Sequence, residues 1–372
     1  MILLMHEGVK RLIDQGYEAY LVGGCVRDYL LGKPLHDVDI TTNATPNEIL
    51  AVFSDYKTFD VGIRHGTVGV LIDKNIVEIT TYRKDNDYEN YRRPKEVTFT
   101  SSLVDDLKRR DFTMNALAYN EIDGLIDCVN GQEDIKKRII RAVGNPDVRF
   151  NEDALRILRA LRFKGQLGFE IEPKTKAAIY KNYHLLDNIA GERINQELNQ
   201  LIVSEFVDDV LKDFKEVIEF LVRQPIRTEA ISYISRSLEV RYALLLSNSE
   251  IAHLKLDKKR TQLITFLIEN RDRQLGTTVY TLLKDLSEFN HKQVVYLAQL
   301  QQVKIDHLLS EIKDKRLIYN IADLQIDGNQ LIKMGYKQGP QIKVLLNLIL
   351  EAVMSGILHN DTKSIQEWLI KQ

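Results

Sequence analysis

The hydrophobic pattern of the chain changes character near residue 145, and this change divides the sequence into two kinds of structure. Before that point, apolar residues repeat with the two-residue period of strands as well as the longer period of helices. After it, helical period dominates, as in 152–163, 174–183, 193–206, 209–221 and 341–354. This order predicts an α+β fold, with a small head followed by a long helical remainder.

The first part contains several strand, helix and turn signals. Thr45 followed by Pro46 marks the start of a helix, because threonine caps free N–H groups and proline fits the first helical position. Residues 73–75 connect two apolar runs and predict a hairpin. The polar stretch 84–95 has no usable period and is predicted to be a loop. The other expected elements are strands at 20–22, 38–41, 68–71 and 76–80, and helices at 25–31, 103–109 and 112–119.

Composition limits the partners and the compartment. The 372 residues are 44% hydrophobic and 28% charged, with a formal net charge of −2, so any nucleic acid must be bound by a local basic surface. The two cysteines, Cys25 and Cys128, are too few for a disulfide framework or a four-ligand zinc site. The apolar stretch 344–354 is interrupted by polar residues and is not expected to span a membrane. We therefore predict a cytoplasmic protein.

Two aspartates in the segment LVGGCVRDYLLGKPLHDVDITT predict a metal centre. Asp37 and Asp39 are two apart in a strand pattern, so both side chains leave the same face of the sheet. Carboxylates this close repel each other unless a cation lies between them, and hard oxygen ligands suit Mg²⁺, which completes its shell with substrate phosphates. Glu78 is a candidate third ligand, although alternation alone does not decide whether it lies on the same face. Upstream, Gly23 and Gly24 let the backbone approach a phosphate closely.

A charged helix is expected to begin after Asn151 as its N-cap. Asp153, Arg156, Arg159 and Arg162 follow one side of this helix as a slowly rotating stripe. The stripe could be a solvated face with an Asp153–Arg156 ion pair. It could also select a base, because an aspartate accepts from the exocyclic amino group of cytosine or adenine while an arginine donates to the adjacent ring nitrogen. Guanine and uracil present a carbonyl and an N–H there, so such a pair would reject them.

These blocks together resemble the bacterial tRNA nucleotidyltransferases of class II, the CCA-adding type within the polymerase-beta-like superfamily. The resemblance rests on LVGGCVRDYLLGKPLHDVDITT, RRDFTMNALAY, DCVNGQEDI, EDALRILRALRF and GERINQEL, which follow in this order. The later segment QIDGNQLIKMGYKQGPQIKVLL matches the helical tail of the family more loosely. The resemblance implies a nucleotidyltransferase head with a mixed β-sheet at 1–143, a base-recognising helical neck at 144–206, a helical body at 207–312 and a tRNA-binding helical tail at 313–372, in an elongated arrangement.

The resemblance also implies roles for individual residues. Asp37 and Asp39 would be catalytic and hold magnesium. The residues implied to bind the nucleotide are Gly24, Arg27, Arg110, Asn115, Asp153, Arg156, Arg159 and Arg162. Among them, Asp153 and Arg156 would pair with the incoming base, and Asn115 would lie near the sugar. Glu192 and Arg193 would brace the neck, where a purely structural ion pair is an equal alternative.

The implied reaction is the template-independent addition of C, C and A to the 3′ end of tRNA. The terminal 3′-hydroxyl would attack the α-phosphate of CTP or ATP, and pyrophosphate would leave. The implied partners are the tRNA acceptor arm, CTP and ATP, without a membrane. The sequence leaves open whether the protein is a monomer or a homodimer.

Several alternative functions remain open. A bacterial poly(A) polymerase shares the head, but the segment 62–68 is closer to the CCA-adding form. An enzyme that adds only CC or only A fits less well, because the loop at 84–95 looks full length. A non-catalytic tRNA-binding module is disfavoured by the intact Asp37 and Asp39 pair. A metal phosphohydrolase is weaker still, since the only His-Asp dipeptide is His36-Asp37.

The stretch 85–95 occupies the place of a loop that this family uses to change from C to A addition. We expect shortening of this loop to preserve incorporation of C into tRNA that lacks its CCA end, and to abolish incorporation of A into tRNA ending in CC. The physical reason is that a pocket shaped for cytosine must be reoriented for adenine. Equal loss of both steps, measured with labelled CTP and ATP, would contradict this hypothesis.

Overall fold

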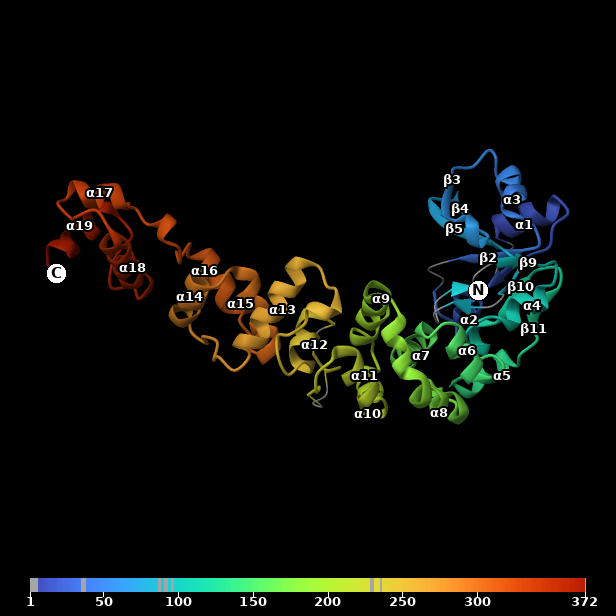
Figure 1. Ribbon diagram of the computed structural model, residues 1–372. Helices are drawn as coiled ribbons and strands as arrows, with labels where there is room; N and C mark the ends of the chain where they lie inside the picture. Colours follow the sequence, from blue (N-terminus) through green and yellow to red (C-terminus); the bar gives the residue numbers. More distant parts are fainter. Residues whose placement is uncertain are drawn as a thin grey trace. The chain divides into compact units, whose positions relative to one another are not determined.

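The computed structural model describes residues 6–34, 38–85, 88–89, 93–94, 97–227, 231–234 and 236–371. The chain divides into two compact units, which can be followed by colour in Figure 1. The first unit comprises Met1–Arg223 and His253–Lys255, and the second comprises Gln224–Ala252 and Leu256–Gln372. The expected α+β head lies in the first unit.

A seven-stranded mixed sheet forms the centre of the head, in the order β11-β10-β1-β2-β5-β4-β3. Strands β2 and β5 run parallel, and the other neighbouring pairs are antiparallel. The small mixed sheet that we expected is therefore confirmed. The strands are β1 Ala19–Val22, β2 Asp39–Thr42, β3 Thr58–Gly62, β4 Thr67–Ile72, β5 Asn75–Thr81, β10 Leu117–Asn120 and β11 Gly124–Asp127.

Local signals set several of these elements. Thr45 and Glu48 form a capping box at the start of α3, with Pro46 in the first turn, as expected. The β4–β5 hairpin turns at Asp73 and Lys74, whose φ angles of 48° and 67° suit the tight turn that matches strand twist. The helices of the head are α1 Glu7–Asp14, α2 Gly24–Leu30, α3 Pro46–Val52, α4 Leu103–Lys108 and α5 Gly131–Lys137.

Helices cover both faces of the sheet. On one face, α1 lies so close to β2 that a Cβ on Gly8 would be 2.8 Å from Ile40 Cδ1. On the other face, Leu107 of α4 shares a buried cluster with Val22 of β1. Since the register pairs Val22 with Asp39, the Asp39 side chain lies on the α4 face. Coverage on both faces explains why every residue of β1 is buried.

Two expectations for the head were wrong. The stretch 84–95 was expected to be a loop, but it contains paired strands: β6 Arg83–Asp85 pairs with β9 Val97–Phe99, and β7 Tyr88–Glu89 pairs with β8 Arg93–Pro94. We call these four strands the ribbon; residues 86, 87, 90–92, 95 and 96 lie outside the described residues. The segment 112–119 was expected to be helical, but it forms one 3₁₀ turn, η2 Thr113–Asn115, and then enters the sheet as β10.

Helices dominate the rest of the first unit, as the periodicity predicts. Two of the expected helices are divided. The expected helix after Asn151 is two helices, because α6 ends at Glu152 and α7 begins at Leu155, and the expected helix 209–221 is divided at Phe214 into α10 and α11. Asn151 is therefore not an N-cap, and Asn145 caps α6 instead. Besides the short parallel pair β12 Ile139–Ile140 and β13 Glu170–Ile171, the elements are α6 Pro146–Glu152, α7 Leu155–Leu167, α8 Pro173–Asn182, η3 Tyr183–Asn188, α9 Gly191–Ile202, α10 Val207–Asp213 and α11 Lys215–Val222.

Three residues from the second half of the sequence complete the first unit. The segment His253–Lys255, which includes part of η4 Ala252–Leu254, packs at the start of α9. Asn195 Nδ2 donates to the Leu254 carbonyl at 2.7 Å. A Cβ on Gly191 would lie 2.8 Å from Lys255 Cγ, so this contact favours glycine at the start of α9.

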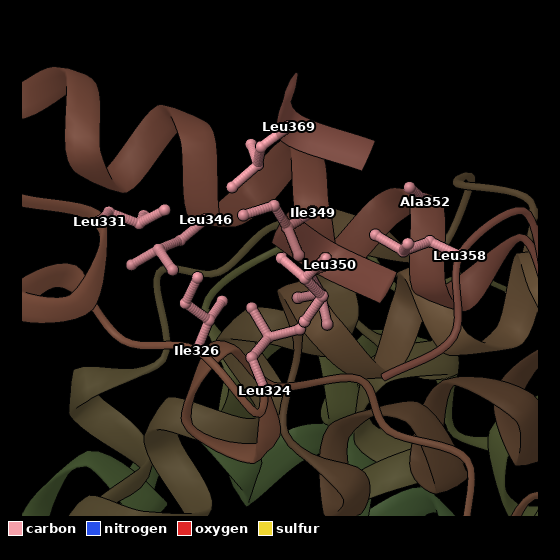
Figure 2. Close-up of a cluster of buried hydrophobic side chains, with 10 residues drawn as sticks. Leu324, Ile326, Leu331, Leu346, Ile349, Leu350, Ala352, Leu358 and Leu369 are labelled. Atoms are coloured by element: carbon pink, nitrogen blue, oxygen red, sulfur yellow. The ribbon is translucent and has the colours of Figure 1, made fainter. Parts of the chain in front are cut away.

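The second unit is helical in the part of it that the structure describes. Figure 2 shows apolar side chains from α17, α18 and α19 gathered in one core, among them Leu331, Ile349 and Leu369. No helix among the described residues is both long and apolar enough to cross a membrane. The helices are α12 Leu238–Leu245, α13 Lys258–Asn270, α14 Val279–Glu288, α15 His291–Gln301, α16 Asp306–Asp314, η5 Ile321–Asp323, α17 Gly328–Lys333, α18 Pro340–Met354 and α19 Thr362–Ile370.

The core in Figure 2 gives a test of the packing of α18. Ile349 is 0% exposed, whereas its neighbour Leu348 is 50% exposed. We expect Ile349→Ala to lower the free energy of opening of α18 by about 2–5 kcal/mol, since it leaves a cavity. Leu348→Ala should change it far less. Hydrogen exchange of the α18 amides in the full chain measures both, and equal effects would contradict this packing.

Candidate active site

The acidic site is built on two adjacent parallel strands. Asp39 of β2 and Glu78 of β5 are register partners, so their side chains lie on the same face of the sheet. The register therefore places Glu78 on the same face as Asp39, which strand alternation alone did not decide. Two carboxylates on the same face supply the oxygen ligands that a divalent cation such as Mg²⁺ prefers. Asp37 lies outside the described residues, and the described residues alone contain no group of three metal-binding side chains.

The glycine turn before α2 brings charged groups close to the backbone. Gly23 has φ 74° and ψ −131°, a conformation that side chains disfavour. A Cβ there would lie 3.4 Å from Arg110 Nη1 and 3.7 Å from Asp39 Oδ2. Asp39 and Arg110, which are far apart in sequence, therefore meet beside this turn. The predicted nucleotide-binding residue Gly24 follows as the first residue of α2.

Arg27 on α2 is held in a fixed orientation. Its Nη1 donates to Asn115 Oδ1 at 2.8 Å, and its Nη2 lies 2.8 Å from Asp28 Oδ1. Asn115 is positioned in turn by Asp111, whose Oδ1 accepts from Asn115 Nδ2 at 3.3 Å. The structure therefore brings together two of the predicted nucleotide-binding residues, Arg27 and Asn115.

Asp111 is a largely enclosed acid, with a side chain 10% exposed, that sequence analysis did not assign to the site. Its Oδ2 accepts from Nε and Nη2 of Arg159 at 2.8 and 2.6 Å. Burial alone would raise the pKa of Asp111, but the Arg159 guanidinium outweighs burial and lowers it to about 2. The carboxylate stays ionised and fixes Arg159. Its place in the RRDFT block was the only signal in the sequence.

Three guanidinium groups surround one aromatic ring on α7. Arg27, Arg159 and Arg162 lie 5.2, 5.4 and 4.3 Å from the centre of the Phe163 ring. Glu197 of α9, another acid not predicted, binds Arg162 Nε at 2.6 Å and lies 3.6 Å from Arg159 Nη1. The face of the Phe163 ring and the Glu197 carboxylate both attract cations, so they offset the repulsion among the three guanidinium groups.

Asp153 lies between α6 and α7 rather than within one helix. Its φ of −139° and ψ of 103° are extended, and its Oδ1 accepts from the Leu155 amide at 3.1 Å. Its Oδ2 binds Arg193 Nη2 at 3.1 Å, so Arg193 of α9 braces this junction. Of the two residues expected to brace the neck, Arg193 thus forms an ion pair, and its partner is Asp153.

Arg156 is buried at the start of α7 and is held from both sides. Its Nη1 donates to Glu152 Oε2 at 2.7 Å, and its Nη2 donates to the Arg109 carbonyl at 3.1 Å. The Arg109 carbonyl directly precedes Arg110, so the structure connects the expected base-reading arginine to the expected nucleotide-binding arginine. Glu152 is a partner that the sequence did not identify.

Known proteins match the whole of this architecture. The poly A polymerase head domain family matches residues 19–141. The family described as "Probable RNA and SrmB- binding site of polymerase A" matches 168–217, and the family described as "tRNA nucleotidyltransferase domain 2 putative" matches 242–369. The CCA-adding enzyme of Geobacillus thermodenitrificans is 36% identical over an alignment that covers 98% of this chain and 95% of that protein. The chain belongs to the CCA-adding enzyme family. The resemblance found in the sequence is thus confirmed, and the protein is a nucleotidyltransferase.

Other CCA-adding enzymes support the same assignment. That of Lacticaseibacillus paracasei is 39% identical over an alignment that covers 96% of this chain and 93% of that protein. The crystal structure of the Bacillus stearothermophilus CCA-adding enzyme in complex with CTP has a TM-score of 0.81 and 31% identity, covering 98% of this chain and 95% of that one. The Thermotoga maritima CCA-adding enzyme complexed with tRNA, at 21% identity and a TM-score of 0.69, covers 98% of this chain and 93% of that one and shares the fold.

The charge on Asp111 should make the stability of this CCA-adding enzyme pH-dependent. Its folded pKa of about 2 lies below the ordinary value of 3.8, so its contribution is complete above pH 3.8 and is lost as the pH falls toward 2. The difference corresponds to about 2 kcal/mol. We expect Asp111→Asn to lower hydrogen-exchange protection of α7 at pH 6, and the difference from wild type to shrink at pH 2.5. A difference that does not depend on pH would contradict this ion-pair role.

Proposed function

We propose that this chain adds C, C and A to the 3′ end of tRNA, using CTP and ATP and releasing pyrophosphate. Its full-length relatives are CCA-adding enzymes, and a relative that is 31% identical was crystallised with CTP. The observation that carries the proposal is the meeting of Asp39 and Arg110 at the Gly23 turn. A carboxylate for a cation and a guanidinium for a phosphate at one turn suit nucleotidyl transfer.

The acidic residues would serve the reacting phosphate. Asp37, Asp39 and Glu78 would hold Mg²⁺, which when bound supplies polarisation of the phosphate oxygens and of the attacking hydroxyl. Arg27 and Arg110 would bind the triphosphate oxygens. Because Asn115 and Asp28 already fix Arg27, little side-chain freedom would be lost when the nucleotide binds.

Asp153 and Arg156 would select the base. A carboxylate has about four lone-pair sites, so Asp153 could accept from an exocyclic amino group while it keeps its bonds to Arg193 and the Leu155 amide. Glu152 and the Arg109 carbonyl hold the Arg156 guanidinium in place, which would fix the direction in which it donates. Arg159 and Arg162 would support the site from the next turns of α7.

The finer assignments belong to the same proposal. The head at 1–143 would perform catalysis and the neck at 144–206 would recognise the base. The body at 207–312 and the tail at 313–372 would contact tRNA. A cytoplasmic location would place the enzyme with tRNA, CTP and ATP.

Single-residue variants test the proposed chemistry. The wild type should add two residues to tRNA lacking its CCA end when CTP alone is offered, and three when ATP is added. Asp37→Ala and Asp39→Ala should each lower the rate by at least about a hundredfold, because the carboxylates that would hold the metal are lost. Asp14→Ala, which removes an exposed acid at the end of α1, is the control. Wild-type rates in both variants, or incorporation of GTP and UTP by the wild type, would refute the proposal.

A further inference from the structure

Asp106 on α4 is a fully buried carboxylate with four partners, although it lies outside the residues assigned to the nucleotide. Its side chain is 0% exposed. We propose that Asp106 is a positioning residue that couples the ribbon to the nucleotide site and so contributes to the change from C to A addition. This inference rests on the proposed function.

The first two partners of Asp106 are arginines that border the nucleotide site. Asp106 Oδ1 accepts from Nε and Nη2 of Arg109 at 2.9 and 2.6 Å, and its Oδ2 accepts from Nη2 of Arg110 at 3.1 Å. The other terminal nitrogen of Arg110 lies beside the Gly23 turn. The carbonyl of Arg109 accepts from Arg156. One carboxylate therefore positions groups on the phosphate side and on the base side of the site.

The other two partners connect Asp106 to the catalytic strand and to the ribbon. Its Oδ2 lies 3.3 Å from Thr41 Oγ1, two residues after Asp39 on β2. Its Oδ1 lies 3.4 Å from the backbone nitrogen of Arg83, the first residue of β6. The neighbouring Asp105 adds a second attachment, because its Oδ2 binds Lys84 Nζ at 2.6 Å. Two consecutive acids of α4 thus hold the base of the ribbon.

The charge of Asp106 is essential to this arrangement. Burial raises the pKa of the carboxyl, but Arg110 and Arg109 together outweigh burial and lower it, so the group is ionised. An asparagine has nearly the same shape but would remove the negative charge that Asp106 supplies to both guanidinium groups. The Asp106 carboxylate therefore connects the base of the ribbon to Arg109 and Arg110.

Three variants separate coupling from stability. Asp106→Asn should raise the KM for CTP and ATP by about tenfold, since Arg110 loses a charge-assisted partner. It should also lower A addition to tRNA ending in CC more than C addition to tRNA lacking CCA.

Asp105→Asn, at a side chain 33% exposed, should leave the KM for CTP within about twofold while lowering A addition. Thr41→Val, nearly isosteric, removes the hydroxyl that contacts both Asp106 and the Thr80 carbonyl, and it should lower both additions equally.

A matched control is Asp285→Asn in the second unit. Asp285 is also a buried acid, with an arginine partner, Arg273, at 3.4 Å and the Gly276 amide at 2.7 Å. The Asp285→Asn substitution should lower thermal stability without changing the KM for CTP. The coupling is overturned if Asp106→Asn lowers only stability and keeps both KM and the ratio of A to C addition. It is equally overturned if Asp106→Asn does not fold and Asp105→Asn keeps the wild-type ratio. Failure of the wild type to add any nucleotide would instead refute the proposed function.

Discussion

Arginine side chains enclosed by protein need carboxylate partners, and this requirement organises the first unit. An unpaired buried charge costs several kcal/mol. Asp106 holds Arg109 and Arg110, and Asp111 holds Arg159. The two arginines paired with Asp106 lie three and four residues after it, whereas Arg159 of α7 lies 48 residues after Asp111, so the second ion pair joins the head to α7. Arg162 of α7 pairs in turn with Glu197 of α9. A chain with a net charge of −2 can in this way present a concentrated, preorganised positive site.

Much of the head could be predicted because many of its helix and turn signals are local. Thr45 and Glu48 are three residues apart and cap α3 on their own, and the β4–β5 turn needs only its two central residues. The segment 112–119 was misassigned because its apolar residues pair with β1 and β11, a non-local contact that outweighs helical periodicity. The break at Asp153 was missed because its side chain bonds to the Leu155 amide and competes with continuation of the helix.

The candidate site could be predicted from the sequence only in part. Glycine and arginine positions in the blocks near α2 and α7 indicated residues that the fold does bring together, such as Arg27 and Asn115. The acidic partners of Arg159 and Arg162 carry no comparable local signal. Asp111 is 48 positions from Arg159, and Glu197 is 35 positions from Arg162. Only the folded chain shows which acid neutralises which arginine.

The segment His253–Lys255 has a consequence for the order of folding during synthesis. A chain that emerges from the ribosome tends to fold its N-terminal part first. Here, however, Asn195 of α9 can donate its hydrogen bond to the Leu254 carbonyl only after residues well beyond Arg223 have been made. The first unit therefore reaches its final packing around α9, which also carries Arg193 and Glu197, only when translation has passed into the second.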